Sequence, residues 1–442
     1  MADIARRPLA AFLALAVLTP LAFASGVEAL LLALLAAQFA AGMLVWDDPV
    51  CKVAFAFLLA VVYSGVSVAG LRLYDVVAFC SLAWWLASLR RGRRPRREHV
   101  AASAVLLAAT VLVFVLAPSG YALVEVARIV ASLGVFLLFA SADGRGEGLP
   151  SVLAVAAAVA VFHSVAVLAL MGASGANLDG AVLSTDVFFE EGELRLCGFF
   201  TDPNKYMSFL LVLLFCALGA RFERKGALVA VLCVASVSTG SRSALISLAL
   251  LAAVAVMRRL AARDRRYAVA VALAVAALAV AVVAIGPATV MQRLYVLSAQ
   301  LMGRDAALQV SPTFMQDNRM LVYISSCGLI ARQPLLGYGW DAMSLLPYPT
   351  HNTVLNVLMC GGVVLLAAYA AFLAPVARRL VRLRLLGFFA TCALVPMMLL
   401  DLFDYRLLFF LFGVLCSDAL LFECPAAPTG PAPDGEGAGD GR

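Results

Sequence analysis

The sequence predicts an all-α polytopic membrane protein, and three features lead to that prediction. The chain has 442 residues, of which 64% are apolar and 14% are charged, whereas soluble domains carry about a quarter charged residues. Apolar runs of roughly 17 to 23 residues recur along it, which is the length that a helix needs to cross about 30 Å of hydrocarbon. These runs lack the alternation in ten-residue segments that is typical of membrane barrels.

The apolar runs predict about fourteen membrane helices, or about twelve if short early runs are re-entrant or interfacial. The predicted helices cover residues 8–24, 27–45, 53–69, 74–89, 100–117, 121–140, 150–172, 204–220, 226–239, 241–257, 267–287, 353–375, 385–400 and 406–421. We expect the first of them to be retained, because no good secretory cleavage site follows it.

Clusters of arginine orient these helices, because Arg and Lys concentrate in short cytoplasmic loops. With the N terminus inside, an alternating count places every cluster on the cytoplasmic side. The clusters are Arg6 with Arg7, "RRGRRPRRE" (90–98), "RFERK" (221–225), "RRLAARDRR" (258–266) and "RRLVRLR" (378–384). The net charge of +6 therefore reflects topology and contact with membrane lipids, and basic runs this short and scattered do not predict a nucleic-acid partner.

Two segments interrupt the hydrophobic rhythm, and the same count places both on the extracytoplasmic side. Ordered loops of this length are usually functional, so we expect the chemistry of the protein at its outer face. The second loop contains a helix-like stretch at 317–339. The predicted organisation is N-terminal transmembrane helices (1–172), an outer loop (173–203), transmembrane helices (204–287), a long outer loop (288–352), C-terminal transmembrane helices (353–421) and a disordered cytoplasmic tail (422–442).

The ten cysteines do not predict a metal site, because nearly all lie inside apolar runs and none has the CxxC or Cys/His spacing of metal ligands. Cys197 and Cys327 fall on the outer side. A disulfide between them is one interpretation and two free thiols the other, since sequence does not give their distance.

Arginines on the outer side are the first candidate functional residues, because they break the charge rule that orients the helices. Arg195, Arg242 and Arg319 lie there, and Arg72 also lies near that side. An ionisable group at a membrane interface is a candidate site, and a guanidinium offers a rigid pair of donors to diphosphate oxygens. The structural alternative is pairing with a carboxylate; for Arg128, for example, Glu125 lies three residues away on the same helix face.

Of the three histidines, His351 is the candidate for catalysis. It precedes the span that starts near 353, so its ring is expected at the outer interface, where a neutral imidazole can accept a proton from a hydroxyl. A histidine that only satisfies a helix start is the alternative. His99, beside a cytoplasmic loop, and His163, in the middle of a helix, are interpreted as structural.

Four motifs in this order resemble the O-antigen ligase and polymerase family of bacterial envelope glycosyltransferases. They are "RLCGFFTDPN", "STGSRS", "DNRMLVYISSCGLIARQPLLGYGWD" and "THNTVLNVLMCGG". The resemblance covers residues 190–375 and implies a many-helix fold of the lipid-carrier glycosyltransferase (GT-C-like) type. It also implies a glycan donor linked to undecaprenyl diphosphate, with no metal or other cofactor, in the bacterial inner membrane with the active site facing the periplasm.

The resemblance implies roles for individual residues. His351 matches the essential histidine of the family, Arg242 and Arg319 match its key arginines, and Arg195 and Asn204 fall in the motif before the next span. The arginines would bind the diphosphate leaving group while His351 acts as general base in a single inverting displacement.

Further polar candidates lie beside His351 and in the turn between the last two predicted spans. Asn352 is expected to orient a sugar or the imidazole. In "DLFDYR" (401–406), Asp401 or Asp404 would orient His351 or contact the acceptor; the other interpretation is a turn closed by an Asp–Arg406 pair.

The sequence is compatible with three classes of acceptor. A lipid A core would make the protein an O-antigen ligase, which we favour. A lipid-linked repeat unit would make it a polysaccharide polymerase, and a protein acceptor would make it an O-oligosaccharyltransferase. A transporter or lipid flippase is the alternative of another class, although we find neither the internal repeat nor the paired broken helices typical of transporters.

Overall fold

The computed structural model describes residues 6–68, 71–89, 95–142, 148–174, 189–190, 193–194, 196–200, 202–220, 225–261, 318–346, 349–403, 405–417 and 421–422. The predicted span 267–287, nearly all of the predicted tail 422–442 and most of the two predicted outer loops lie outside these residues.

The described chain is all-helical apart from two hairpins of two-residue strands, which confirms the predicted fold class. The longer helices are α1 (Arg6–Ala24), α2 (Glu28–Met43), α3 (Pro49–Val62), α4 (Leu73–Leu89), α5 (Arg97–Leu116), α6 (Gly120–Ala140), α7 (Leu149–Ser174), α8 (Pro203–Gly219), α9 (Lys225–Ser238), α10 (Arg242–Ala261), α13 (Asn318–Arg332), α14 (Thr353–Arg382) and α17 (Arg406–Cys416). Short elements are β1 (Ser67–Val68), β2 (Leu71–Arg72), β3 (Phe189–Glu190), β4 (Glu193–Leu194), η2 (Trp340–Leu345), α15 (Leu386–Phe389), the π-helical turn η3 (Ala390–Leu394) and α16 (Val395–Leu399).

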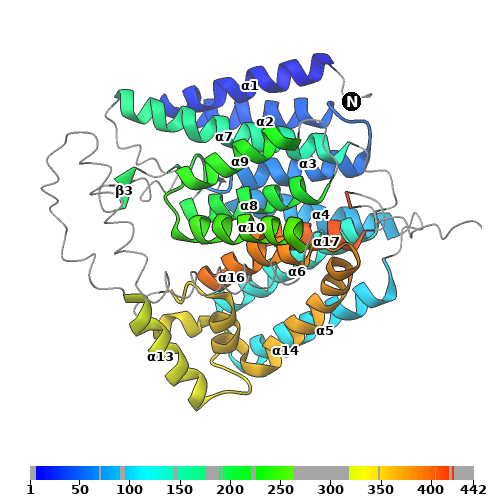
Figure 1. Cartoon of the computed structure of the whole chain (residues 1–442), viewed down its shortest axis with the longest axis vertical. Coiled ribbons are helices and arrows are strands. Elements are labelled where there is room, and N and C mark those ends of the chain that lie inside the picture. The colour runs from blue at the N-terminus through cyan, green and yellow to red at the C-terminus, as the bar shows by residue number, and fades with distance from the viewer. Residues whose placement is uncertain are drawn as a thin grey trace, which may run out of the picture.

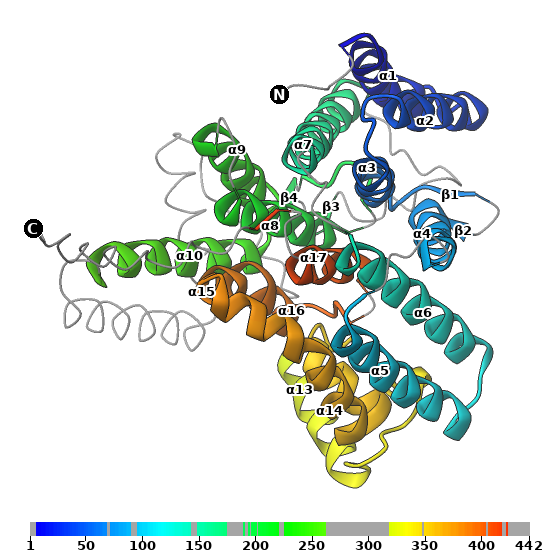
Figure 2. The same cartoon turned by 90° about the vertical axis from the view of Figure 1, so that its right-hand side faces the viewer.

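The helices run side by side as one bundle (Figure 1). Seen from the side in Figure 2, α17 lies near the centre, with α1 and α2 at one edge and α13 and α14 at the opposite one. Every residue of α17 is buried, which fits a helix that is apolar on all faces. Within the described residues, five helices are long and apolar enough to cross a membrane, and nine shorter apolar helices accompany them. The chain is a multi-pass membrane protein.

Every predicted span inside the described residues coincides with a helix, but several boundaries differ. Helix α3 ends at Val62, within the predicted span 53–69, and α14 continues beyond the predicted span 353–375 to Arg382. The predicted helix 317–339 ends at Arg332, because Pro334 disfavours helical geometry in the residue before it. The predicted span 385–400 is divided by the π-helical turn into α15 and α16. The predicted span 406–421 ends at Cys416, where α17 stops.

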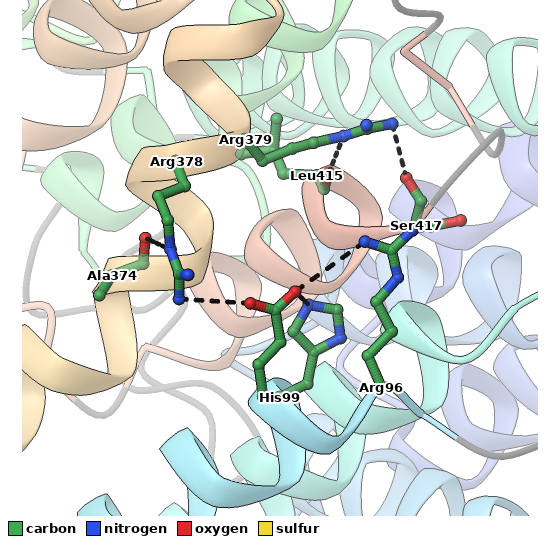
Figure 3. Close-up of polar contacts among 8 residues, drawn as sticks. Arg96, His99, Ala374, Arg378, Arg379, Leu415 and Ser417 are labelled. Atoms are coloured by element: carbon green, nitrogen blue, oxygen red, sulfur yellow. Dashed lines mark hydrogen bonds and ion pairs between the residues drawn. The ribbon is translucent and has the colours of Figure 1, made fainter.

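The arginine-rich start of α5 and end of α14 meet at one end of the bundle. Arg378 of α14 pairs with Glu98 of α5 at 3.3 Å, and Arg96 lies 3.9 Å from the same carboxylate. Arg379 donates hydrogen bonds to the carbonyls of Leu415 and Ser417, which the end of α17 leaves without helical partners (Figure 3). The start of α5 and the ends of α14 and α17 are therefore joined.

Helix α14 is broken at Gly362, and the segment 334–339 fills the break. Gly362 has φ +60° and ψ −158°, so the helical hydrogen bonds stop there. The segment satisfies the freed groups. The Tyr338 and Gly339 amides donate to the carbonyls of Met359 and Cys360, at 2.7 and 2.9 Å. The amides of Val363 and Val364 in turn donate to Pro334 and Leu335. Backbone from outside the helix thus replaces its own hydrogen bonds.

His163 has a structural role, as predicted. Pro20 lies inside α1 and has no N–H, which leaves the carbonyl of Ala16, four residues earlier, without a helical donor. The His163 Nε2 of α7 lies 2.8 Å from that oxygen, and the imidazole is fully buried. The ring therefore supplies the hydrogen bond that the proline removes and joins α7 to α1.

This hydrogen bond predicts that the effects of substitutions at His163 and Pro20 on stability are coupled. His163→Leu should lower the stability of the chain by about 1 kcal/mol, because the Ala16 carbonyl loses its donor inside the bundle. In a Pro20→Ala background the same substitution should cost clearly less, since an alanine at position 20 would supply its own N–H. A double-mutant cycle of unfolding in detergent measures the difference; equal losses in both backgrounds would contradict this account.

Of the two interpretations of Cys197 and Cys327, the structure shows the second, because both thiols are free. Cys197 is buried and its Sγ donates to the carbonyl of Phe200, 2.9 Å away. Cys327 is exposed on α13.

Candidate active site

The candidate site is a cavity of about 310 Å³ at the end of the bundle where several helices begin. The first residues of α6, α8 and α14 lie around it, and Arg72 directly precedes α4. This is the opposite end of α5 and α14 from the arginine-rich cluster of Figure 3. The lining residues are Arg72, Tyr121, Glu125, Arg128, Asp202, Asn204, Lys205, Trp340, Met343, Pro349, His351, Asn356, Cys360, Leu400, Asp401, Leu402 and Phe403.

Helix N-termini around a cavity make it favourable for anions. The free N–H groups and the aligned peptide dipoles of each helix place partial positive charge at its first turn. Arg72, Arg128 and Lys205 add formal charge to the same wall. Glu125, Asp202 and Asp401 also line the cavity, so cations and carboxylates face the same space.

His351 lines this cavity from an unusual backbone conformation. Its φ is +45°, the left-handed region that residues with a Cβ rarely adopt. It directly precedes Asn352, the N-cap of α14, whose Oδ1 accepts the Leu355 amide at 3.0 Å. The other side-chain group of Asn352, Nδ2, donates to the Met398 carbonyl at 2.9 Å. Asn352 is buried and does not line the cavity, so its amide acts on the backbone beside His351.

Asp401 lines the cavity together with His351, and its main-chain neighbours belong to the turn before α17. The Nδ2 of Asn356, one helical turn after Asn352, donates to its carboxylate. The alternative in which Asp401 closes the turn with Arg406 is wrong; Asp404 lies outside the described residues. Arg406 is buried, pairs with Asp75 of α4 and lies over the Tyr74 ring at 4.3 Å. Helices α4 and α17 both pack against α6, which places Asp75 near Arg406.

Because the Arg406 side chain of the Asp75–Arg406 pair is buried, we expect the stability of the chain to depend strongly on each of the two residues. Asp75→Asn should destabilise the chain by about 3–5 kcal/mol, because it leaves the guanidinium buried without a counter-ion. Replacing both residues with leucine should cost less than that single substitution. As a control, Arg378→Ala breaks a pair whose arginine is 61% exposed and should cost at most about 1 kcal/mol. Equal effects in the buried and the exposed pair, measured by unfolding in detergent, would contradict the argument.

The predicted ion pair between Glu125 and Arg128 is confirmed, and the pair faces the cavity. Arg128 Nη1 lies 2.5 Å from Glu125 Oε1, and the two side chains are 25% and 8% exposed. Lys205, in the first turn of α8, lines the same cavity, and its carbonyl accepts the Tyr405 hydroxyl at 3.1 Å. Burial raises the pKa of Tyr405 well above its ordinary value, with smaller effects from Tyr74 and Asp202, so this phenol stays protonated.

Asn204 connects the cavity to the motif that contains Arg242. The hydroxyl of Ser241 donates to Asn204 Oδ1 at 2.9 Å, so the start of α10, whose first residue is Arg242, lies beside the cavity wall. Arg319 is the second residue of α13. The structure describes the backbone of these two arginines, while Arg195 lies outside the described residues; its neighbour Leu196 donates to the Ser238 carbonyl at the end of α9.

The structure thus brings His351, Asn204, Arg72 and Asp401 into one cavity. Sequence reasoning missed Lys205, Asn356 and Trp340 as members of it. Asn356 had a detectable signal, because it follows Asn352 by four residues and so lies on the same face of α14. Trp340, stacked on Phe403 at 5.8 Å, is placed by the fold alone. Among the described residues, no group of three or more His, Cys, Asp or Glu side chains is arranged to hold a metal ion.

The arrangement is chemically suited to displacing an anionic leaving group. The cations and helix starts can bind a polyanion, and an imidazole and a carboxylate in the same space can accept a proton from an incoming nucleophile. Residues 226–370 match the family model described as O-antigen ligase. The match covers three of the four motifs that carry the resemblance, and confirms it. No curated protein matches the chain.

Proposed function

We propose that this chain, whose residues 226–370 form an O-antigen ligase domain, transfers a glycan from undecaprenyl diphosphate to an acceptor hydroxyl at the periplasmic face of the bacterial inner membrane. The domain indicates glycosyltransferase activity of this family. The observation that carries the finer proposal is the cavity that His351 shares with Arg72, Lys205 and the first turns of α6 and α8.

The chemistry follows from the donor. Its lipid diphosphate is already a good leaving group, so the enzyme needs to bind the charge, hold the anomeric carbon in line and activate the acceptor. Arg242 and Arg319, together with Arg195, bind the diphosphate, with Arg72 on the same wall. His351 takes the proton of the acceptor hydroxyl as its oxygen forms the new bond to the anomeric carbon. The bond from that carbon to the diphosphate oxygen breaks, the leaving group keeps the electron pair, and the configuration inverts without a metal ion.

The orientation in the membrane is supported by charge. Arginines of α5 and α14 gather at the end of the bundle opposite the cavity. Since positively charged loops remain in the cytoplasm, the cavity end faces the periplasm. That orientation fits a lipid-linked donor that is presented at the outer leaflet.

An enzyme is favoured over a transporter by the way in which α14 is broken. Broken helices of transporters leave backbone groups free to bind substrate near the middle of the membrane. Here the groups around Gly362 bond to residues 334–339, so protein backbone fills the break. The polar side chains gather at one end of the bundle, where surface chemistry is expected.

The test is transfer by the purified chain in liposomes with a chelator and without nucleotide sugar. The donor is a glycan on undecaprenyl diphosphate, offered with lipid A core, with a second lipid-linked unit or with a protein acceptor. We expect product on lipid A core, as for an O-antigen ligase. Product on the lipid-linked unit or the protein would instead identify a polymerase or an O-oligosaccharyltransferase. A folded chain that uses none of the three would overturn the proposal, and donor uptake by the same liposomes would then support transport.

A further inference from the structure

The start of α14 is fastened by two buried side chains to the turn that carries Asp401. The hydroxyl of Thr353 donates to the Leu400 carbonyl at 2.9 Å and accepts the Leu402 amide at 3.0 Å. Asn352 donates to the Met398 carbonyl at 2.9 Å. We call Asn352 and Thr353, with the 398–402 segment that they bind, the clasp. Both side chains are buried, at 8% and 1% exposure.

The clasp joins two walls of the cavity that are far apart in sequence. One wall is His351, which directly precedes the clasp residues of α14. The other wall is Leu400, Asp401 and Leu402, which all line the cavity. Because the Thr353 hydroxyl binds the residues on both sides of Asp401, it fixes the backbone of that residue relative to the backbone of His351.

The strained backbone of His351 needs surrounding contacts, such as those of the clasp, to hold it in place. A left-handed φ in a residue with a Cβ is costly and persists only where the surroundings determine it. Local contacts add to the clasp, because the Thr350 hydroxyl donates to the Asn352 carbonyl at 3.4 Å. A helix N-cap alone would fix Asn352, but it would not fix the distance from His351 to the opposite wall.

We infer that Thr353 is a positioning residue, which holds the His351 imidazole in its working position through the clasp. The inference rests on the proposed function, in which that imidazole receives the acceptor proton. Thr353 itself is buried against the turn and is absent from the cavity lining, so it acts through His351 and the 400–402 backbone.

The discriminating pair of variants is Thr353→Val and Thr353→Ser. Valine keeps the shape of threonine and loses both hydrogen bonds, whereas serine keeps the hydroxyl. Thr391→Val is the matched control, because the Thr391 hydroxyl is also buried and donates to the Phe388 carbonyl at 3.0 Å, outside the cavity lining. If Thr353→Val does not fold, Asn352→Ser removes the bond to Met398 while keeping an N-cap oxygen, and is interpreted in the same way.

Two measurements are made on each variant. The first is steady-state glycan transfer. The second is the rate at which diethyl pyrocarbonate modifies His351 across pH, followed on the His351 peptide by mass spectrometry, which does not depend on transfer. We expect Thr353→Val to lower kcat about 10- to 100-fold with KM for the donor within about threefold, since a small misplacement of a reacting group has effects of this size. The pH midpoint of His351 modification should shift, and serine should restore both properties.

Each other outcome is decisive. Wild-type kcat and an unchanged modification profile in Thr353→Val would overturn the inference, as would a loss of kcat that matches the loss of folded protein or that appears equally in Thr391→Val. If the wild type transfers no glycan, the proposed function fails, yet a modification profile that changes in the valine variant and not in the serine variant still supports the positioning role.

Discussion

Replacing His351 with alanine should lower kcat for glycan transfer by about 10²- to 10⁴-fold, the range that a positioned general base contributes. The donor KM should change little, because the diphosphate contacts that we propose come from arginines on other helices. The folded fraction should be retained, since His351 is only partly buried and alanine, which also carries a Cβ, leaves the backbone strain at φ +45° about as it was. Transfer by the purified variant in liposomes, normalised to folded protein, measures the effect.

The pH dependence gives an independent check on the role of the imidazole. A general base must be unprotonated, so the wild-type kcat should fall as the pH is lowered and the ring takes a proton. The residual rate of His351→Ala should lack this fall. His99→Gln is the matched control. His99 lies beside Glu98 at the end of α5 that is far from the cavity, so this variant should retain the wild-type kcat. Full turnover by His351→Ala would remove the general-base role and leave binding of the diphosphate by the arginines as the main source of catalysis.

The membrane helices could be predicted because their signal is local. A run of apolar residues of sufficient length forms a helix in hydrocarbon, where every backbone group must be paired within the segment. Charge clusters then orient successive helices. For the same reason the ion pair of Glu125 with Arg128 was predictable, since three residues on one helix place the side chains on the same face.

The partners across the cavity were not predictable because they depend on packing between distant segments. Arg406 was predicted to pair within its own turn, yet 331 residues separate it from Asp75, its observed partner (406 − 75). Thr353 was not singled out as a candidate, because nothing local distinguishes it from an ordinary helix residue, and the only local signal of Asn356 is its spacing from Asn352. The sequence thus located the candidate site through His351 and Asn204. The residues that position it, such as Thr353 and Asn356, are identified only in the structure.

Gly362→Ala should be the most damaging substitution outside the catalytic residues. At φ +60° and ψ −158° Gly362 lies in a backbone region that is essentially restricted to glycine. A Cβ there would lie 2.3 Å from the Leu335 carbonyl carbon and 2.4 Å from its oxygen. Those atoms are backbone and are held by the Val364 hydrogen bond, so they have no low-energy way to move aside. We expect a loss of at least about 3 kcal/mol of stability, or failure to accumulate in the membrane.

The consequence for function follows from the segment that occupies the break. Residues 334–339 lead directly into Trp340, which lines the cavity, and the interrupted helix begins beside His351. If α14 becomes continuous, the segment loses its backbone partners and Trp340 loses its position against Phe403. Gly226→Ala is the matched control, because a Cβ at Gly226 in α9 meets nothing within 4 Å and alanine is the better helix former. Thermal unfolding in detergent and transfer by the folded fraction should separate the two, and equal stability of both variants would show that the filled break is not needed to hold the cavity together.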